Sequence, residues 1–223
     1  ARLIMVGDKD QLPSVGAGNV LADVIKSKVV PVYCLTQIYR QDEHSLIVSN
    51  AHAINNGKMP VIDNKSRDFF FSSCEEPEEI LSTVIDMVTK RLPGFTGVEA
   101  NRIQVLCPMK KGVAGVENMN AKLPETLNRP AKGKPELRVG MNVLRLHDKI
   151  IHTINNYDLE WTDEDGSAGS GIYNGDIGYI TAINPTEPSL TVRFEDGKIA
   201  KYTQGALDQI KPAYAVSVHK SQG

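Results

Sequence analysis

Two polar side chains stand at positions where nucleotide chemistry is often found, and Gln11 is the first. It lies in the segment Gly7–Gly16 (GDKDQLPSVG), directly after the apolar run Leu3–Val6. Ligands of doubly wound sheets bind beyond the carboxyl ends of such strands. An amide both donates and accepts hydrogen bonds, so Gln11 is suited to contact a phosphate oxygen and a water together. An ordinary polar turn, with Asp8 and Asp10 as turn or cap residues, explains the same segment.

The second is Arg40, in the segment Gln37–Gln41 (QIYRQ), just beyond another predicted strand. A planar guanidinium can bind phosphate through two parallel hydrogen bonds. In phosphoryl transfer, such an arginine stabilises the charge that develops on the transferred group. The alternative interpretation is a surface ion pair.

Two further polar turns follow apolar strands. Lys110 lies in the segment Cys107–Gly115 (CPMKKGVAG), and His219 and Lys220 lie in HKSQG at the end of the chain. Lysines in a glycine-containing loop are suited to contact backbone phosphates. A solvated lysine pair is the simpler interpretation of the first segment, and the second is only suggestive by itself.

The segments NNYD (155–158) and YNGDIG (173–178) are rich in turn residues. Asn-Gly between apolar residues is mainly turn chemistry. Tyr157 or Tyr173 is able to stack on a base, although an aromatic residue in the core or rim of a barrel explains each equally well.

The elements that position these residues alternate in the first part of the chain. An apolar run at 1–6, a helical spacing at 18–27 and a second apolar run at 29–35 predict a β-α-β unit of a doubly wound sheet. Helices are predicted at 42–54 and 75–92. A further helix is predicted after the loop at 108–115 and ends at about residue 126. Further strands are predicted at 68–72, 103–107 and 213–218, and 128–137 reads as a linker.

From residue 137 to about 210 the segments become short and alternating. The stretch Thr191–Tyr202, with Asp196-Gly197 at its centre, predicts a β-hairpin. We therefore expect a small antiparallel barrel. The acidic, Gly- and Ser-rich residues 162–171 predict a mobile loop within it.

Composition excludes little. The net charge is −2, so binding of nucleic acid by overall positive charge is not indicated. The three cysteines form no CxxC pair, and we predict no metal site. No apolar run approaches the ~20 residues that span a bilayer, and the start is unlike a signal peptide, so a cytoplasmic protein without membrane contact is expected.

The order of these segments resembles that of the RecD-like superfamily 1 DNA helicases, the exodeoxyribonuclease V alpha subunit family. The series is GDKDQLPSVG, QIYRQ, NAHAINNG, CPMKKGVAG, NNYD, YNGDIG and AYAVSVHKSQG. The resemblance implies an ATP hydrolase that translocates along single-stranded DNA, 5′ to 3′, and unwinds duplex junctions in DNA repair and recombination. It identifies the chain as motif III to motif V.

The resemblance also implies residue roles. Gln11 would sense the γ-phosphate and Arg40 would act as an arginine finger. Coupling of nucleotide state to DNA would involve Gly7, Asp8, Asp10 and Gln41. The DNA path would involve Pro13, Val15, Lys110, Asn155, Asn156, His219 and Lys220.

The sequence departs from the family pattern in several places. It contains no GxxxxGK[ST] loop, and the acidic pair that holds magnesium and the motif VI arginine are absent. ATP and Mg²⁺ would therefore bind mainly through residues outside this segment. We expect an internal fragment with negligible ATP turnover by itself. The insert 162–171 separates NNYD from YNGDIG, which makes DNA contacts of the barrel uncertain.

We predict an α/β fold with a RecA-like, P-loop NTPase-type parallel sheet and an inserted SH3-like β-barrel. Residues 1–41 would end the first motor domain 1A. Residues 42–137 and 212–223 would form most of domain 2A, and 138–211 the inserted domain 2B. The alternatives are a non-catalytic DNA- or partner-binding module and an accessory subunit of a recombination nuclease complex. A P-loop kinase or GTPase has little support, because nothing in those families pairs QIYRQ with HKSQG.

Overall fold

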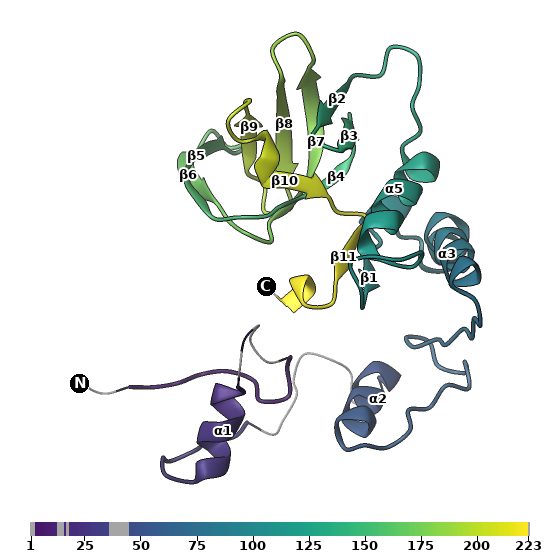
Figure 1. The fold of residues 1–223 in the computed structure, drawn as a ribbon, viewed down its shortest axis with the longest axis vertical. Helices are drawn as coiled ribbons and strands as arrows, with labels where there is room; N and C mark the ends of the chain where they lie inside the picture. Colours follow the sequence, from purple (N-terminus) through teal and green to yellow (C-terminus); the bar gives the residue numbers. More distant parts are fainter. Residues whose placement is uncertain (1–2, 13–15, 17, 36–44, 223) are drawn as a thin grey trace. The chain divides into compact units, whose positions relative to one another are not determined.

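The computed structural model describes residues 3–12, 16, 18–35 and 45–222 (Figure 1). The chain divides into two compact units, residues 1–73 and 74–223. Each unit is described by itself.

The first unit contains two helices, α1 (Val20–Ser27) and α2 (Leu46–Asn55). The Asp68 carboxylate covers the start of α2, because it accepts hydrogen bonds from Ser45 Oγ at 2.5 Å and from Leu46 N at 3.3 Å. The buried Asn50 side chain bonds both backbone groups of Val61, at 2.7 and 2.8 Å. The side chains of Asn50 and Asp68 therefore hold residues 61 and 68 against α2 by hydrogen bonds.

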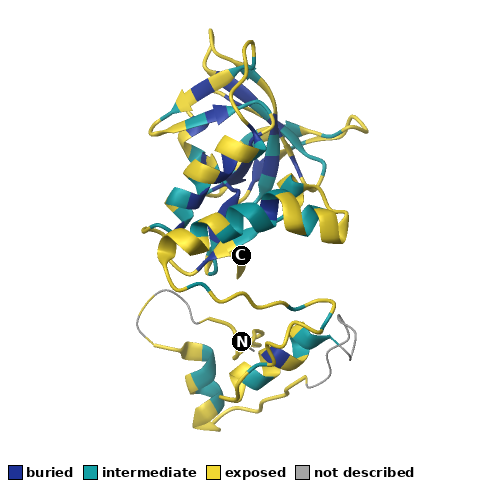
Figure 2. Cartoon of the chain, turned by 90° about the vertical axis from the view of Figure 1, so that its right-hand side faces the viewer, coloured by how far each residue is buried: buried dark blue, intermediate teal, exposed yellow. Residues whose placement is uncertain are grey.

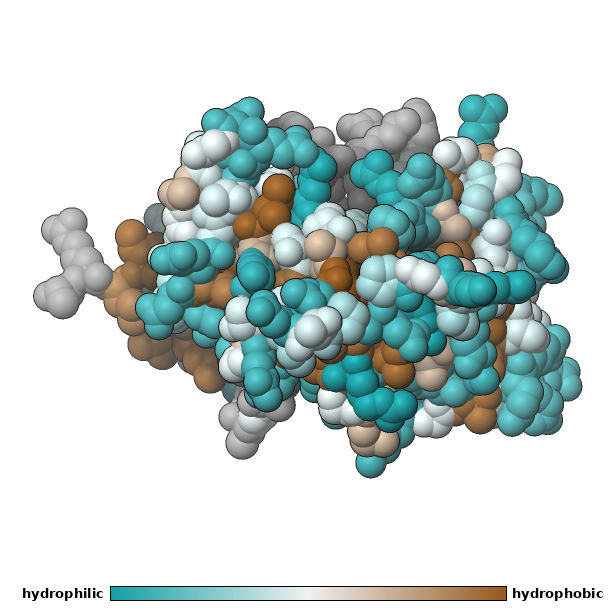
Figure 3. All heavy atoms as spheres, turned by 90° about the horizontal axis from the view of Figure 1, so that it is seen from above, coloured by the Kyte–Doolittle hydropathy of each residue, from teal (hydrophilic) through white to brown (hydrophobic). Residues whose placement is uncertain are grey.

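The strands predicted at 1–6, 29–35 and 68–72 are wrong for the described residues, none of which forms a strand before residue 74. Leu3 and Val6 are 86% and 94% exposed. Figure 3 shows hydrophobic residues, in brown, at the surface. A buried parallel strand needs neighbouring strands and helices over both faces. Within the described part of this unit, no backbone ladder pairs with these runs.

The second unit begins with a long helical segment made of α3 (Pro77–Asp86), the π-helical turn η1 (Met87–Arg91) and α4 (Leu92–Thr96). Pro77 occupies the first turn, where its missing N–H costs nothing. Gly97 ends the segment with a φ of 72°. The helix predicted at 75–92 is confirmed, and it continues by about one turn.

A parallel strand pair follows, in which β1 (Val105–Cys107) lies beside β11 (Ala215–Ser217). The short 3₁₀ turn η2 (Ala100–Arg102) precedes β1, and α5 (Val116–Leu127) packs on the pair. The Asn120 side chain bonds Ala215 N at 2.9 Å and Ala215 O at 2.8 Å. The two strands predicted at 103–107 and 213–218 are thus confirmed.

The largest sheet has the order β10-β4-β7-β8-β9-β5-β6, and each of its pairings is antiparallel. We call residues 136–212 the β-domain. Its strands are β2 (Glu136–Val139), β3 (Asn142–Arg145), β4 (Lys149–His152), β5 (Asn156–Thr162), β6 (Ala168–Ile172), β7 (Ile177–Asn184), β8 (Ser189–Phe194), β9 (Ile199–Tyr202) and β10 (Ile210–Pro212). The 3₁₀ turns η3 (Leu207–Gln209) and η4 (Lys220–Gln222) precede β10 and follow β11.

The core of the β-domain comes from the inward face of these strands, and Figure 2 shows the buried residues concentrated there. Alternation along β8 and β9 places every second side chain inside. The hairpin predicted at 191–202 is confirmed as β8 and β9, with Gly197 at a φ of 94° in the turn. The core consists of Leu137, Leu144, Ile150, Ile172, Ile180, Leu190, Val192, Phe194, Ala200, Tyr202, Leu207 and Ile210.

The mobile loop predicted at 162–171 is wrong, because β5 and β6 form a hairpin across it. The glycines that suggested disorder instead make room for aromatic rings. A Cβ at Gly169 would lie 2.7 Å from the Trp161 ring, and one at Gly171 would lie 2.8 Å from the Tyr173 hydroxyl. Rings that cover glycine backbone in this way stabilise the pairing of a sheet edge.

Candidate nucleic-acid interface

In the first unit, Asp8 organises the loop that follows Leu3–Val6. Its carboxylate accepts a hydrogen bond from Asp10 N at 3.0 Å and another from Gln11 Nε2 at 3.3 Å. Lys9 Nζ lies 2.8 Å from Asp10 Oδ1, and this hydrogen bond is the main cause that lowers the pKa of Asp10. Asp8 is therefore a turn residue that also orients the exposed Gln11 amide.

Gly7 lies directly before this turn. A Cβ there would lie 2.9 Å from Leu21 Cδ2 of α1, so the loop passes close to that helix. The other predicted residues of this unit, Pro13, Val15, Arg40 and Gln41, lie outside the described residues.

In the second unit, Lys110 lies in a tight loop between β1 and α5. Its carbonyl accepts from Glu117 N at 3.0 Å, and a Cβ at Gly115 would lie 2.4 Å from Lys111 O. Only glycine fits at that crossing. The exposed Lys110 ammonium lies 3.8 Å from Glu117 Oε1, which offsets part of its charge.

The turn after β11 meets the β-domain. Lys220 Nζ donates a hydrogen bond to Asn174 Oδ1, although 46 residues separate the two in sequence. Asn174 N donates in turn to Asn155 Oδ1 at 2.9 Å. Burial and the neighbouring Lys211 lower the pKa of Lys220. The structure thus brings together two predicted DNA-binding residues, Asn155 and Lys220, and the exposed His219 lies next to them in sequence.

Asn156, by contrast, has its side chain engaged inside the β-domain. Its Oδ1 accepts from Asp158 N at 3.1 Å and Leu159 N at 3.0 Å, and its Nδ2 donates to Gln209 Oε1 at 2.9 Å. These bonds fix the start of β5. They account for Asn156 as a turn residue, and its role in DNA binding stays a prediction.

Next to Asn174 lies a cluster made of Tyr157, Trp161, Tyr173 and Lys198, in which the Lys198 ammonium is also paired with Asp196 Oδ2 at 2.7 Å. The rings of Tyr157 and Tyr173 meet edge to face at 5.8 Å, and they are 64% and 42% exposed. Lys198 Nζ lies 5.5 Å from the Trp161 ring and 5.9 Å from the Tyr173 ring. Exposed rings beside cations are the components with which proteins bind single strands.

Asn174 and Lys198 were not identified as site residues from the sequence. Asn174-Gly175 was recognised only as a turn, which it is, with Gly175 at a φ of 107°. Lys198 lies in the hairpin predicted at 191–202, and the pattern that predicts this hairpin indicates strands and gives no role to Lys198. These two residues lie near each other because strands from distant segments pair, and such pairing produces no pattern in the local sequence.

The interface rests on a buried polar network at the junction of α5, the β-domain and β11. The Asp148 carboxylate accepts from Tyr214 Oη at 2.8 Å, Asn128 Nδ2 at 2.5 Å and Arg145 N at 2.7 Å. Asp148 is 2% exposed. Burial, with Asp148 alongside, raises the pKa of Tyr214, so its hydroxyl remains a donor.

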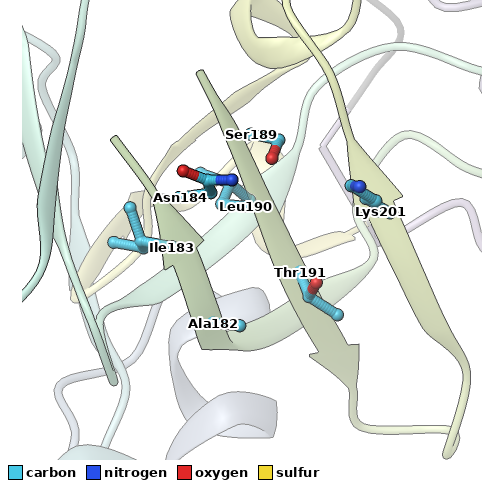
Figure 4. Close-up of a pocket in the computed structure, with 7 residues that line it drawn as sticks. All are labelled: Ala182, Ile183, Asn184, Ser189, Leu190, Thr191 and Lys201. Carbon is cyan, nitrogen blue, oxygen red and sulfur yellow. The ribbon is translucent and has the colours of Figure 1, made fainter. Parts of the chain in front are cut away.

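A small cavity of about 250 Å³ lies at the opposite end of β7 from Asn174 (Figure 4). It is lined by Ala182, Ile183, Asn184, Ser189, Leu190, Thr191 and Lys201. Lys201 is its single charged side chain. Among the described residues there is no cluster that could hold a metal ion and no helix able to span a membrane.

Two family models match separate parts of the chain. The model of the AAA domain matches residues 1–70, and that of the ATP-dependent RecD-like DNA helicase SH3 domain matches residues 119–194. The predicted fold class is confirmed by these matches, the β-domain and the parallel pair β1–β11. The AAA match implies nucleotide binding.

Curated relatives name the family more closely. The chain is 32% identical over 223 residues to the ATP-dependent RecD2 DNA helicase of Deinococcus radiodurans. It is 27% identical over 246 aligned positions to the RecBCD enzyme subunit RecD of Mycobacterium tuberculosis. Both matches include 100% of this chain, which spans 27% of the first protein and 38% of the second. The chain is thus similar over its whole length to RecD-like DNA helicases, and the predicted resemblance is confirmed.

Among solved structures, Bacteroides Pif1 bound to ssDNA matches 85% of this chain and 42% of its own chain. The sequence identity is 17% and the TM-score is 0.47.

Proposed function

We propose that this chain is part of an ATP-dependent DNA helicase that translocates along single-stranded DNA, 5′ to 3′, and unwinds duplex junctions. Its setting would be DNA repair or recombination in the cytoplasm. Residues 1–41 would belong to motor domain 1A, 42–137 and 212–223 to domain 2A, and 138–211 to the inserted domain 2B.

One observation carries this proposal. The turn that contains His219 and Lys220 meets the Asn155 and Asn174 loops of the domain that matches the RecD-like SH3 model. Cationic, amide and aromatic groups thereby lie along one surface, with Tyr157 and Tyr173 exposed beside them. Phosphates and bases of a single strand are the ligands that such a surface suits.

In the whole protein, ATP and Mg²⁺ would bind between the motor domains, mainly through residues outside this chain. Gln11, oriented by Asp8, would contact the γ-phosphate, and Arg40 would stabilise charge on it during transfer. Gly7, Asp10 and Gln41 would transmit the state of the nucleotide. Pro13, Val15, Lys110, Asn155, Asn156, His219 and Lys220 would line the DNA.

Three of the relatives support a variant of this proposal. The mycobacterial RecD proteins are named as subunits of the RecBCD enzyme. The whole protein would then work beside a nuclease chain. Co-purification with large nuclease partners distinguishes this arrangement from a helicase that works alone.

The test is ATP turnover by the whole protein with and without single-stranded DNA. We expect stimulation of at least tenfold by an oligonucleotide, because translocation couples DNA binding to closure of the nucleotide cleft. The ATPase rate is measured over a series of oligonucleotide concentrations. A rate that does not respond to DNA overturns the proposal.

A further inference from the structure

We propose that Asn174 is a positioning residue, through which the β-domain holds the Lys220 side chain in place before DNA arrives. This inference rests on the proposed function, because it deepens the role given there to Lys220. Asn174 itself need not touch the DNA. Its part is to fix where a cation meets the phosphate backbone.

The first support is the chain of hydrogen bonds. Lys220 Nζ donates to Asn174 Oδ1, and Asn174 N donates to Asn155 Oδ1 at 2.9 Å. Lys220 is half-buried although its neighbours His219 and Ser221 are exposed. The ammonium is therefore directed toward the β-domain.

The second support is the rigidity of the turn that carries Asn174. Gly175 N donates to His152 O at 2.9 Å, and His152 N donates to Asp176 O at 2.8 Å. The Asp176 carboxylate accepts from Tyr173 N at 2.7 Å. His152 lies in β4 and is fully buried, so the turn is anchored directly to the core of the β-domain.

The third support is that the backbone of Lys220 is fixed independently. Lys220 N donates to Ser217 Oγ at 3.2 Å, and Ser217 ends β11. Close to the start of that strand, Tyr214 bonds the buried Asp148 of the β-domain. The backbone of Lys220 is thus held by Ser217, and its ammonium is held by Asn174.

The consequence follows from side-chain entropy. A free lysine loses its rotamer freedom when it meets a phosphate, whereas a lysine already held by Asn174 has lost much of it beforehand. A neutral amide oxygen is a weaker acceptor than a phosphate oxygen, so the ammonium can exchange one for the other. Removal of the amide should weaken single-strand binding by about three- to tenfold.

The experiment is a double-mutant cycle in the whole protein with Asn174→Ala, Lys220→Met and both changes together. Affinity for a fluorescent oligo-dT is measured by anisotropy at fixed salt. We expect Asn174→Ala alone to weaken binding, and the double variant to bind no worse than Lys220→Met. Asn174 does not have a positive φ, so alanine is compatible with its backbone. Independent effects of the two changes, multiplied in the double variant, overturn the inference.

The matched control is Asn184→Ala. Asn184 is also a turn asparagine of the β-domain, and its Oδ1 accepts from Thr186 N at 3.1 Å and Glu187 N at 3.2 Å. It lies at the other end of β7, so this variant should leave affinity unchanged. A loss equal to that of Asn174→Ala would assign the effect to the stability of the domain and overturn the inference.

A second readout needs no DNA. The acetylation rate of the Lys220 amine is measured by mass spectrometry in the free protein, and it should rise severalfold in Asn174→Ala. An unchanged rate overturns the inference even where DNA binding is normal. A raised rate in a protein that binds no single strand supports the contact and refutes the proposed function, so the two failures are distinguishable.

Discussion

At the scale of single residues, Asp148 connects three separate parts of the second unit through buried hydrogen bonds. It is buried, it accepts three hydrogen bonds, and its donors come from the end of α5, from β3 and from the residue before β11. A buried carboxylate is tolerated only when its hydrogen bonds are made. Asp148 therefore joins the helices to the β-domain through bonds that cannot be removed without cost.

We predict that Tyr214→Phe lowers the free energy of unfolding by about 1–3 kcal/mol, because the buried Asp148 carboxylate loses one of its three donors. Unfolding in urea measures the loss. The control is Tyr157→Phe, at an exposed hydroxyl, which should change stability by less than about 0.5 kcal/mol. Equal stability of Tyr214→Phe and the unmodified chain would contradict the structural role of this bond.

At the scale of elements, the β5–β6 hairpin decides the shape of the candidate interface. It turns within residues 163–167 and returns the chain, so that Asn156 pairs with Ile172 and NNYD lies beside YNGDIG. The insert that separates the two segments in sequence therefore does not separate them in space. Gly171, at a φ of 105°, lets the Tyr173 ring lie over the strand.

We predict that Gly171→Ala destabilises this hairpin by about 1–3 kcal/mol through backbone strain, and further through displacement of Tyr173. Trp161 is the single tryptophan of the chain and lies against Gly169, so its fluorescence reports the hairpin during unfolding. Gly166→Ala is the matched control, because its φ of 84° imposes strain while no atom lies within 4 Å. If both variants lose the same stability, the contact with Tyr173 contributes nothing.

At the scale of the whole molecule, the chain combines a segment that matches the AAA domain model with one that matches the model of the RecD-like SH3 domain. Its net charge of −2 provides no general attraction for DNA, so the proposed binding of DNA would depend on a local arrangement such as that around Lys220. Nucleotide chemistry and DNA binding would then depend on different residues. They should be separable by substitution.

We predict that Arg40→Ala in the whole protein lowers ATP turnover by about 10³-fold or more, as loss of an arginine finger does. Affinity for single-stranded DNA should change by less than about threefold. Steady-state ATPase and anisotropy measure the two quantities. Arg67→Ala, at an exposed arginine of the same unit, serves as the control. Parallel loss of turnover and DNA affinity would show that Arg40 is structural.

Local sequence patterns predicted the correct elements where neighbouring residues fix the backbone. Asp196-Gly197 between apolar alternations predicted the β8–β9 hairpin, and the apolar runs at 103–107 and 213–218 predicted β1 and β11. The same reasoning was wrong for Leu3–Val6 and for residues 162–171. An apolar run becomes a strand only beside a partner, and glycines form a strand when aromatic rings cover them.

The sequence by itself determined the order of the motifs, and with it the resemblance to RecD-like helicases, because motif order is a property of the chain alone. It also located Asn155 and Lys220 as candidates. Only the tertiary structure decided that they share one surface and that Asn174 lies between them. The reason is physical: a hydrogen bond between residues 46 positions apart depends on the register of seven paired strands and on the buried joint at Asp148.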